Sequence, residues 1–556
     1  MTETAPMTAP TATPASFASV HALFAATAAR TPDAEFLFTE SVTAAAYGIE
    51  AGPIRWSEAR AEVDRLRAAY AEAGHGHGHR VGLLLENRPV FLFHWLALNS
   101  LGVSVVPINA EMRSAELVYL IGHSEIELAV SLPQRAGDLR SAAAKSGVKF
   151  QAIGPDDAPP PALSPAPRAA EPIDADTECG LLYTSGTTGR PKGCILSNGY
   201  FLRAGEWYAA LDGACSIRRD AERVMTPLPL NHMNAMAFST MVVLTAGGCL
   251  VQLDRFHPSS WLASARESRA TVVHYLGVMP AMLLSAPPSP ADRDHSIRWG
   301  FGAGVDKKNH APFEERFGFP LVEAWAMTET GAAACIMANR EPRQIGTSCF
   351  GRQEPYLDLR LVDEAGQDVA ADQPGELLVR SAGSDPRRHF FSGYLKDEEA
   401  TREAWADGWF HTGDLVRRDA GGNFFFVDRK KNVIRRSGEN ISAVEVESVL
   451  NQHPAVKTSA VAATPDAVRG DEVLACVVLH DSQAGKPGSE ETAASIVAHA
   501  LDQLAYYKAP GYVAFVDALP LTPSQKIQRG QLREMALALP GQPNCIDTRS
   551  MKKRQD

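Results

Sequence analysis

The run YTSGTTGRPKG, residues 183–193, combines hydroxyl side chains, glycines and a lysine in one short stretch. Glycine lets backbone N–H groups approach a ligand closely, Ser and Thr hydroxyls add donors, and Lys192 adds a positive charge. These groups suit the binding of phosphate. The flanking runs GLLY and GCIL are typical of strands, and a helix is expected only after Ser197 and Asn198. The pattern therefore predicts a hairpin loop that closes over a phosphate-bearing ligand.

This loop does not match a P-loop. A P-loop carries a second glycine five residues after the first, followed by lysine, between a strand and a helix. Counting from Gly186, the second glycine would fall on Pro191. A plain Ser/Thr/Gly turn without a ligand is the alternative that the residues leave open.

The composition is that of an ordinary globular protein long enough for two or more domains. The chain has 556 residues, of which 45% are hydrophobic and 21% are charged. Its formal net charge of −11 gives no overall attraction to nucleic acid or to an anionic membrane. No nucleic-acid partner is therefore expected, and a polyanionic ligand must be held by local groups.

The sequence also predicts a cytoplasmic protein. Its 8 cysteines are scattered without zinc-type spacing, which is typical of reduced thiols in the cytosol. Residues 1–16 have neither a basic nor an apolar region, so we expect a disordered tail and not a signal peptide. The most hydrophobic region, residues 81–108, is interrupted by Glu86 and Arg88, which favours strand, helix and strand over a membrane span.

Two further segments are expected at the surface. HGHGHR, residues 75–80, suggests metal binding, but it falls in a predicted turn with no carboxylate or cysteine nearby, which favours an exposed turn. Residues 154–172 are rich in Pro and Ala, which predicts an extended linker ahead of the hairpin.

Helical and strand patterns alternate from about Val20, which predicts an α/β fold with largely parallel sheet. Residues 56–74 have apolar residues at helical spacing, and the runs 80–85, 103–108 and 271–276 are typical of strands. Beyond about residue 440 the pattern changes to a compact α+β unit of roughly a hundred residues. Its predicted elements are helix 442–454, strands 456–466 and 473–480, and helix 492–505.

YTSGTTGRPKG resembles the signature loop of the adenylate-forming superfamily, which contains acyl-CoA synthetases, the adenylation domains of peptide synthetases and luciferases. The resemblance extends over about residues 16–539, and the chain is most similar to acyl-CoA synthetases of the carnitine/crotonobetaine–CoA ligase type. It implies a large N-terminal α/β domain with mixed sheets at residues 17–429 and a small, mobile α+β domain at 430–540. A hinge near Lys431 would join them, and residues 541–556 would form a loose polar tail.

The resemblance implies a nucleotide site built on two glycine-containing stretches. The hairpin loop would bind the phosphates of ATP, and Lys192 would steady the departing pyrophosphate. Adenine would lie along GFGAGV, residues 300–305, where small side chains leave room for a flat base. The residues assigned to these stretches are Thr184, Ser185, Gly186, Thr187, Thr188, Gly189, Lys192, Gly302, Ala303 and Gly304.

EAWAMTETG, residues 323–331, is similar to the family's aromatic-Gly-x-Thr-Glu run. By that likeness Trp325 would stack on adenine and Thr328 would hydrogen-bond the α-phosphate. Glu329, together with Thr184, would hold Mg²⁺, a hard cation that prefers oxygen ligands. The neighbouring residues assigned to the same site are Ala324, Ala326 and Met327. A capped helix start is the alternative for this run.

Two candidate catalytic residues come from other motifs. His232 in PLPLNHMNAM resembles the family's histidine that borders the acyl pocket and the substrate carboxylate, with Asn231 where an aromatic is common. Lys526 in LPLTPSQKIQRGQL keeps the place of the family's catalytic lysine, although Gln525 replaces the usual glycine. Lys526 would bridge the carboxylate and the α-phosphate. A structural histidine and a solvated lysine are the alternatives.

GWFHTGDL and VDRKKNVIRRSGENIS supply the remaining positions that the resemblance implies. Asp414 is expected to accept hydrogen bonds from the ribose hydroxyls, and Arg429 to make a second ribose or phosphate contact. The loop within SGENIS resembles the one that guides the pantetheine arm of CoA. Its assigned residues are Ser437, Gly438 and Glu439.

The resemblance implies an AMP-forming acid–CoA ligase that uses ATP, Mg²⁺ and CoA. Asn231, Ala326 and the strand that carries His274 favour a small or polar acid. Three alternatives stay open: an adenylating enzyme that charges a separate carrier protein, a luciferase-like oxygenase and an inactive nucleotide-binding protein. The sequence does not decide between a monomer and a homodimer, and no stable membrane insertion is expected.

Overall fold

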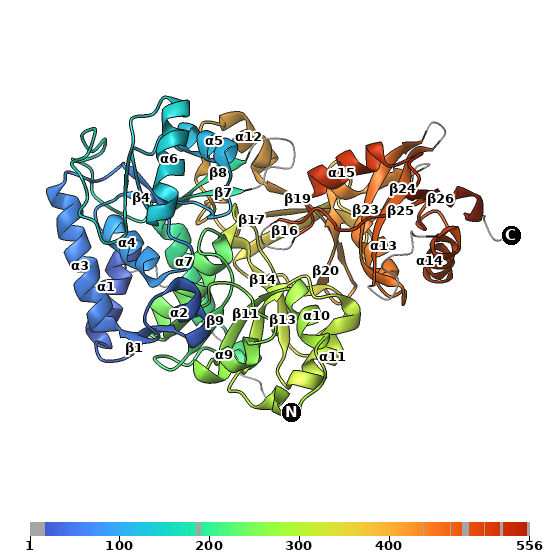
Figure 1. The fold of residues 1–556 in the computed structure, drawn as a ribbon, viewed down its shortest axis with the longest axis horizontal. Coiled ribbons are helices and arrows are strands. Elements are labelled where there is room, and N and C mark those ends of the chain that lie inside the picture. The colour runs from blue at the N-terminus through green and yellow to red at the C-terminus, as the bar shows by residue number, and fades with distance from the viewer. Residues whose placement is uncertain are drawn as a thin grey trace.

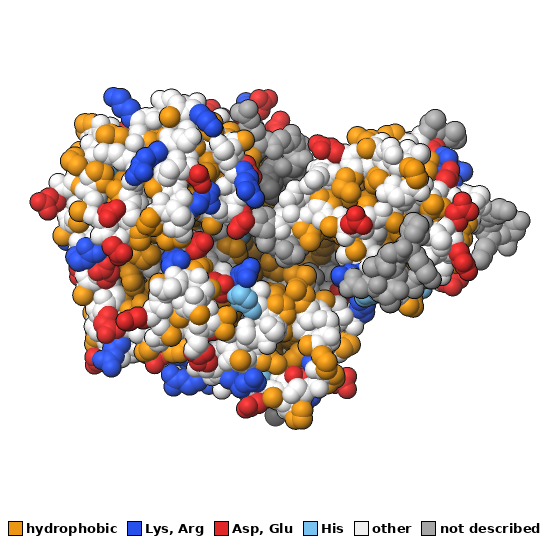
Figure 2. Space-filling view, in the orientation of Figure 1, with side chains coloured by type: hydrophobic (Ala, Val, Ile, Leu, Met, Phe, Trp, Pro, Cys, Tyr) orange, Lys and Arg blue, Asp and Glu red, His pale blue; other side chains and the backbone are white. Residues whose placement is uncertain are grey.

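The computed structural model describes residues 17–184, 191–436, 439–466, 469–480, 489–504, 506–522 and 526–552. Figure 1 shows a large body, coloured from blue to light orange, and a smaller C-terminal part in orange and red at one side. On the face shown in Figure 2, the outline narrows where these two parts meet. None of the helices within the described ranges combines the length and apolar character needed to cross a bilayer.

The first sheet of the body has the strand order β18-β8-β7-β4-β3-β5-β6 and is parallel from β7 to β6. Its strands are β3 (Arg80–Leu84), β4 (Ser104–Pro107), β5 (Leu128–Ser131), β6 (Gln151–Ile153), β7 (Glu178–Thr184), β8 (Lys192–Ser197) and β18 (Gly393–Tyr394). Nearby helices are α1 (Val20–Arg30), α3 (Trp56–Glu72), α4 (Pro89–Asn99), α5 (Ser114–Ser124), α6 (Pro133–Ser146), α7 (Asn198–Ala209) and α12 (Glu398–Ala404). The succession β3, α4, β4 confirms the strand, helix and strand predicted for residues 81–108.

Helix α3 illustrates how the apolar spacing sets the packing. Its start is capped by Glu58, whose carboxylate accepts a hydrogen bond from the Arg55 backbone N–H at 2.7 Å. The residues that it buries recur at intervals of three and four and therefore lie on one face. They are Trp56, Ala59, Val63, Leu66 and Tyr70.

The second sheet has the order β14-β13-β12-β11-β9-β10-β1-β2 and is parallel from β13 to β1. Its strands are β1 (Glu35–Thr39), β2 (Gly52–Arg55), β9 (Arg223–Thr226), β10 (Cys249–Gln252), β11 (Val272–Leu276), β12 (Trp299–Ala303), β13 (Leu321–Trp325) and β14 (Ile336–Met337). Its neighbouring helices are α2 (Ser41–Tyr47), α8 (Thr240–Ala246), α9 (Trp261–Glu267), α10 (Val278–Leu284) and α11 (Lys307–Phe317). In open α/β sheets, ligands bind outside the carboxyl ends of parallel strands, and the predicted adenine-binding segments follow β12 and β13.

A third, antiparallel sheet completes the body in the order β15-β20-β19-β17-β16. Its strands are β15 (Cys349–Arg352), β16 (Leu357–Val362), β17 (Pro374–Ser381), β19 (Phe410–Arg418) and β20 (Asn423–Arg429). Parallel and antiparallel strands thus occur together, which confirms the predicted mixed α/β architecture. The chain leaves this sheet at Arg429 and enters the C-terminal part.

The C-terminal part has its own sheet, in the order β22-β21-β24-β25-β26 with β23 beside β24. Its strands are β21 (Ile434–Arg436), β22 (Glu439–Ile441), β23 (Val456–Asp466), β24 (Gly470–Leu479), β25 (Tyr512–Phe515) and β26 (Cys545–Asp547). Helices α13 (Ala443–Leu450), α14 (Glu490–Gln503) and α15 (Arg529–Ala538) complete it. The predicted helices and strands of this unit are confirmed, and their apolar residues form clusters separate from the core of the body.

Two predictions about exposed segments are wrong. His75 and His77 are each 7% exposed, because their imidazoles contact the backbone carbonyls of Pro160, at 3.0 Å, and Glu171, at 3.2 Å. The proline-rich stretch 154–172 leaves such carbonyls without strand or helix partners, so the histidines of the turn satisfy them. His75 and His77 are therefore buried under the linker, whereas Gly78 in the same turn is exposed.

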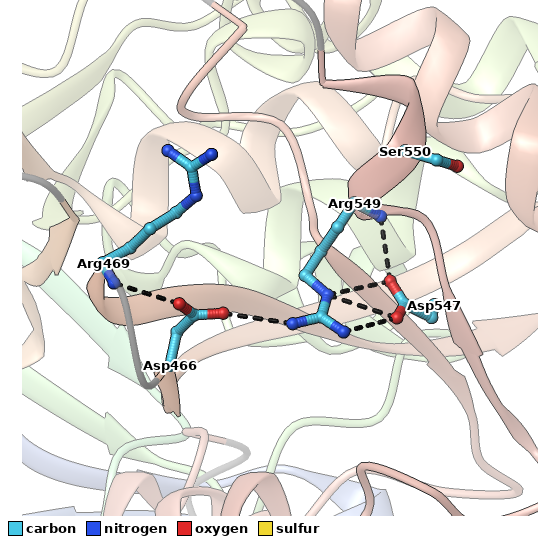
Figure 3. Close-up of a pocket in the computed structure, with 5 residues that line it drawn as sticks. All are labelled: Asp466, Arg469, Asp547, Arg549 and Ser550. Carbon is cyan, nitrogen blue, oxygen red and sulfur yellow. Dashed lines mark hydrogen bonds and ion pairs between the residues drawn. The ribbon is translucent and has the colours of Figure 1, made fainter.

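The predicted loose tail at 541–556 is also corrected. Residues 545–547 form β26, which pairs antiparallel with β25. Just beyond it, Arg549 forms ion pairs with Asp547 at 2.7 Å and with Asp466 at 3.1 Å (Figure 3). Residues 545–552 are thus a packed part of the C-terminal sheet, because the backbone of β26 completes the hydrogen bonding of an edge strand.

Candidate active site

The hairpin predicted at residues 183–193 is formed by β7 and β8. These strands are antiparallel, and Thr184 lies opposite Lys192 at their ends. Helix α7 begins directly after β8, where the Ser197 hydroxyl accepts a hydrogen bond from the Tyr200 backbone N–H at 3.3 Å. The segment that follows the loop is thus strand β8, and the helix begins only at Asn198, as the sequence predicted. The assigned loop residues between the strands, 185–189, lie outside the described residues.

Lys192 and Glu329 both contact Tyr394. Glu329 is 7% exposed, and its carboxylate accepts a hydrogen bond from the Tyr394 hydroxyl at 2.9 Å. The Lys192 ammonium lies 4.8 Å from the centre of the same ring and 3.8 Å from the Asp397 carboxylate. The short strand β18 thereby links the end of the hairpin to the candidate magnesium ligand.

Cys194 brings the two candidate magnesium ligands together. Its buried thiol is within hydrogen-bonding reach of both the Thr184 hydroxyl and the Glu329 carboxylate, and burial raises its pKa well above the ordinary value. Beside it, the Tyr200 hydroxyl is buried and has no hydrogen-bond partner among the described residues. A hydroxyl and a carboxylate are donors that suit a hard cation whose other ligands are phosphate oxygens. Thr184 and Glu329 therefore fit Mg²⁺.

Asp414 forms a second polar cluster with Trp325 and Arg429. The Trp325 indole N–H donates to Asp414 Oδ2 at 2.9 Å, and Arg429 Nε lies 2.9 Å from Asp414 Oδ1. Asp414 and Arg429 are register partners on β19 and β20. Burial raises the pKa of Asp414 above its ordinary value, and the charge of Arg429 opposes this rise.

The Oδ1 atom of Asp414 is ion-paired with Arg429 but still has capacity to accept a hydrogen bond. Asp414 is 2% exposed, and this oxygen accepts no hydrogen bond from the described residues despite the ion pair with Arg429. A buried carboxylate oxygen without a donor is costly, and a hydroxyl group from a ligand would satisfy it. Trp325 itself is only 6% exposed, because its ring packs 6.2 Å from Phe350. Little of this ring is open for the predicted stacking on adenine.

The predicted adenine-binding segment is held by a residue that the sequence analysis missed. The Glu323 carboxylate accepts hydrogen bonds from the backbone N–H groups of Gly304 and Val305, both at 3.0 Å. Ala303 and Gly304 are exposed, whereas Gly302 is buried, and a Cβ there would lie 2.3 Å from the Tyr275 carbonyl oxygen. A charged residue inside the apolar strand LVEAW was the signal that could have identified Glu323.

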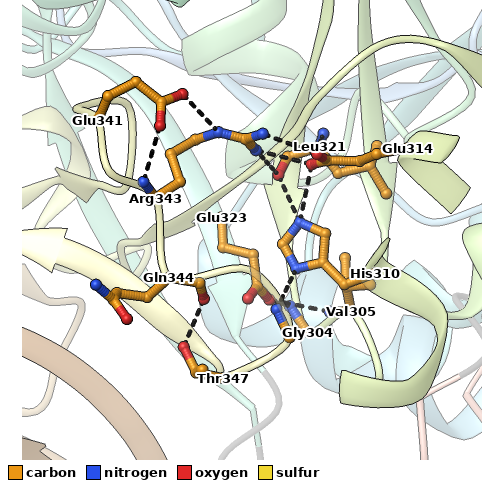
Figure 4. A network of polar contacts seen from close by, with 11 residues as sticks. Gly304, Val305, His310, Glu314, Leu321, Glu323, Glu341, Arg343, Gln344 and Thr347 are labelled. Carbon is orange, nitrogen blue, oxygen red and sulfur yellow. Dashed lines mark hydrogen bonds and ion pairs between the residues drawn. The ribbon is translucent and has the colours of Figure 1, made fainter. Parts of the chain in front are cut away.

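Figure 4 shows the network around Glu323. His310 contacts the Leu321 carbonyl at 2.9 Å and the Glu314 carboxylate at 3.2 Å, and Arg343 binds both oxygens of Glu314 at 2.7 Å. Burial alone would raise the pKa of Glu314, but the hydrogen bonds from Arg343 and His310 hold it at about 2. These contacts join α11 to the start of β13, the strand that carries Glu323.

The other assigned residues of EAWAMTETG follow β13 in a tight turn. Thr328 is half-buried there, and the Gly331 backbone N–H donates to the Met327 carbonyl at 2.9 Å. Ala324, Ala326 and Met327 pack partly buried against the core of the body. The run is therefore a strand end and a turn that leads into the buried 3₁₀ helix Gly331–Ala334, whose N-cap residue Thr330 makes no side-chain capping hydrogen bond.

His232 and Lys526 come from different parts of the chain and meet here. His232 is open to solvent in a recess with many protein atoms around it, and this burial, together with the charge of Lys526, lowers its pKa to about 4. Lys526 is likewise exposed to solvent, and the protein atoms around it and the charge of Arg429 lower its pKa. Its loop is held by the Thr522 hydroxyl, which accepts a hydrogen bond from the Lys526 backbone N–H at 3.0 Å.

His274 does not take part in this site. It is fully buried, and its ring contacts the Tyr208 hydroxyl at 2.8 Å, the Ser239 hydroxyl at 2.9 Å and Asn234 Oδ1 at 2.6 Å. Burial lowers its pKa to about 3, so it is a neutral core histidine. It therefore gives no support to the expectation of a polar acid pocket.

The loop assigned to pantetheine lies only partly within the described residues. Ser437 and Gly438 fall outside them, and Glu439 begins β22. Directly before this loop, Arg436 ends β21. The predicted role of residues 437–439 stays a prediction.

Known proteins resemble the chain over nearly its whole length. The family model "AMP-binding enzyme" matches residues 24–395, and "AMP-binding enzyme C-terminal domain" matches residues 445–526. A sulfoacetate–CoA ligase of Cupriavidus necator is 31% identical over 535 residues, which cover 93% of this chain and 98% of that protein. A crotonobetaine/carnitine–CoA ligase of Shigella flexneri is 30% identical over 491 residues, covering 86% and 92%. The crystal structure of ATP-bound MatB from Rhodopseudomonas palustris aligns with a TM-score of 0.77 and 26% identity, covering 93% and 99%.

Proposed function

The chain belongs to the AMP-binding enzymes and is an AMP-forming acid–CoA ligase that uses ATP, Mg²⁺ and CoA, and on this premise we propose that Lys526 joins a small, polar acid to ATP. The observation that carries the proposal is that Lys526 lies near enough to His232 for its charge to lower the pKa of the imidazole, and near enough to Arg429 for the charge of Arg429 to lower its own pKa. This proximity supports a C-terminal part that is oriented for the first half-reaction. The test is ATP–pyrophosphate exchange with the Lys526→Ala variant.

In the first half-reaction, a carboxylate oxygen of the acid attacks the α-phosphorus of ATP, and the bond to pyrophosphate breaks. Both reactants are anionic, so a cation between them lowers their repulsion, and the Lys526 ammonium takes this position. Thr328 donates a hydrogen bond to the α-phosphate, and Lys192 holds the departing pyrophosphate. When bound by Glu329 and Thr184, Mg²⁺ supplies positive charge to the phosphate oxygens.

The nucleoside is oriented by the Asp414 cluster. Asp414 Oδ1, which accepts no hydrogen bond from the described residues, accepts one from a ribose hydroxyl, and Trp325 fixes the carboxylate by its hydrogen bond to Oδ2. Arg429 adds a contact to ribose or phosphate. The base lies against the exposed backbone of Ala303 and Gly304, which Glu323 holds in place.

In the second half-reaction, the thiol of CoA attacks the acyl carbonyl, and AMP leaves. Lys526 would stand in the way, so the C-terminal part, proposed as residues 430–540, turns about a hinge near Lys431. Contacts beside this point would be exchanged on turning. They include Lys430 with Glu376 at 2.7 Å, and Asp428 with the Ser442 hydroxyl at 3.0 Å. The turn would bring residues 437–439 to the pantetheine arm.

A cluster of aromatic side chains beside the histidine element supports a short acyl pocket. Phe238 lies on the π-helix Asn234–Ser239, which comes after His232 in the chain. The centre of its ring lies 5.3 Å from that of Phe301 and 5.5 Å from that of Trp207. Each of these three side chains is 7% exposed or less, so their rings fill the interior there and leave no room for a long acyl chain. The names of two relatives, the sulfoacetate–CoA and crotonobetaine/carnitine–CoA ligases, likewise point to small polar acids.

Release of AMP with CoA across short, polar and long acids tests the substrate proposal. A preference for short polar acids supports it, and a preference for palmitate contradicts it. CoA is favoured over a carrier protein as acceptor because the two relatives named above are CoA ligases. We also propose that the reaction takes place in the cytoplasm, where ATP and CoA are supplied. A homodimer stays a prediction for measurement in solution.

A further inference from the structure

The last described residues return to the C-terminal sheet and enter its core. They lie beyond residue 526, where the match to the family model ends. Strand β26 pairs with β25, and Thr548 then anchors the chain through two hydrogen bonds, from its N–H to the Gly511 carbonyl and from its hydroxyl to the Pro510 carbonyl, both at 2.9 Å. This path carries the chain inward to Lys552.

Lys552 forms a buried ion pair with Glu472. The side chains of both are 0% exposed, and the Lys552 ammonium donates to Glu472 Oε1. The other oxygen, Oε2, accepts a hydrogen bond from Arg436 Nε at 2.8 Å, and Arg436 is also buried. Gly511 makes room for this cluster, since a Cβ there would lie 2.5 Å from the Glu472 carboxyl carbon.

The geometry of this cluster constrains all three side chains. Ions removed from water are stable only when they are closely paired, so Glu472 cannot shift toward one cation without weakening the other pair. Arg436 ends β21 directly before residues 437–439, the loop proposed above to guide pantetheine. The buried cluster therefore links Lys552 to the residue directly before that loop.

We propose that Lys552 is a positioning residue for thioester formation: through Glu472 it holds Arg436 and so sets the backbone that enters the loop at residues 437–439. This inference rests on the proposed role of that loop in the second half-reaction. Lys552 contacts no residue of the site around Lys526 and His232, so the first half-reaction does not depend on it. The two half-reactions therefore respond differently when the cluster is cut.

The same segment offers a matched control in Arg549. It lines an open pocket of about 580 Å³ together with Asp466, Arg469, Asp547 and Ser550 (Figure 3). Arg549 is 44% exposed and pairs with Asp466 and Asp547, but it does not touch Glu472. Arg549→Met thus removes a cation from the segment without cutting the link to Arg436.

The experiment compares Lys552→Met and Arg549→Met in both half-reactions. ATP–pyrophosphate exchange measures the first, and release of CoA thioester from a synthetic acyl-adenylate of the best acid in the panel measures the second. We expect Lys552→Met to lower the second rate by roughly tenfold and to leave exchange near the wild-type rate. Arg549→Met leaves both rates unchanged, and Lys552→Arg restores most of the second rate.

Retained exchange also shows that the C-terminal part is folded, because Lys526 belongs to it. If Lys552→Met does not fold, Glu472→Gln replaces it, with the same selective loss expected. Equal losses in both half-reactions, or an unchanged second rate in the Lys552→Met enzyme, overturn the inference. A wild-type enzyme that forms no thioester from acyl-adenylate and CoA overturns the proposed function itself, and that result is seen before any variant is made.

Discussion

The indole N–H of Trp325 donates a hydrogen bond to Asp414 Oδ2 at 2.9 Å, across the boundary between the second and third sheets of the body. Both residues are nearly fully buried, so this bond fixes the one carboxylate available for ribose. In the proposed nucleotide site, Trp325 would therefore act through Asp414 as well as through any contact of its ring.

Replacing Trp325 with Phe keeps an aromatic ring but leaves Asp414 Oδ2 without its donor. A buried acceptor that loses its partner costs about 1–3 kcal/mol, so we expect the KM for ATP to rise roughly tenfold while the KM for the acid changes little. Steady-state kinetics check this. Trp409→Phe is the matched control, because its ring lies 4.2 Å from the Arg380 guanidinium and outside the site. A normal KM for ATP in Trp325→Phe would contradict the role.

The pKa of His232 reports directly on Lys526. The ordinary value of 6.5 falls to about 4 because of burial and then the charge of Lys526. The imidazole is therefore neutral at pH 6–8, and activity in that range should show no inflection from it. The stability that this lowered pKa contributes is present above pH 6.5 and is lost as the pH falls toward 4.

An NMR titration of His232 tests this relationship without any activity measurement. We expect a midpoint near pH 4 in the wild-type protein and a higher midpoint in Lys526→Ala, because the repelling charge is gone. An identical midpoint in the two proteins would show that Lys526 lies far from His232 in solution.

Glu329→Gln tests the proposed magnesium site. The neutral amide loses the charge that binds the cation, so we expect the rate of ATP–pyrophosphate exchange to fall by roughly a hundredfold and to need more Mg²⁺ for half-saturation. Tyr394→Phe removes only the hydroxyl that donates to Glu329 and should have a smaller effect. A Glu329→Gln enzyme with an unchanged Mg²⁺ requirement would exclude Glu329 as a ligand.

Glu323→Ala removes the acceptor for two backbone N–H groups, those of Gly304 and Val305. Val305 is buried, so its N–H would stay unpaired at a cost of about 1–3 kcal/mol in the free energy of unfolding. We expect a lower Tm and a higher KM for ATP, with thioester formation from supplied acyl-adenylate less affected. Thermal unfolding and kinetics measure the two effects separately, and a loss of stability alone would limit Glu323 to a structural role.

Much of the fold could be predicted because it depends on local patterns. The hairpin of β7 and β8 and helix α3 follow from apolar periodicity, since each element buries one face or its whole length. The mixed architecture of two parts follows from the order of such elements. The boundaries of the tail could not be predicted, because β26 is a very short strand whose partner β25 is about thirty residues away.

The site was predictable only where a motif carries it. Lys526 and His232 were identified by resemblance, and only the folded chain shows that they lie near enough for the charge of Lys526 to act on His232. Glu323 could have been identified only as a charged residue in an apolar strand, whereas the buried cluster of Lys552, Glu472 and Arg436 depends on contacts between distant segments, which no local pattern reveals. His274 lies in a strand next to the site, but its side chain faces the core, and one residue's shift along a strand decides between those two outcomes.

The proposed adenylation step depends most on Lys526, and the Lys526→Ala variant tests this step most directly. ATP–pyrophosphate exchange measures adenylation, and thioester release from supplied acyl-adenylate and CoA measures the second half-reaction in the same preparation. We predict that exchange is lost while thioester release stays close to the wild-type rate. Equal loss of both half-reactions, or retained exchange, would contradict the assignment of Lys526 as the residue that joins the acid to ATP.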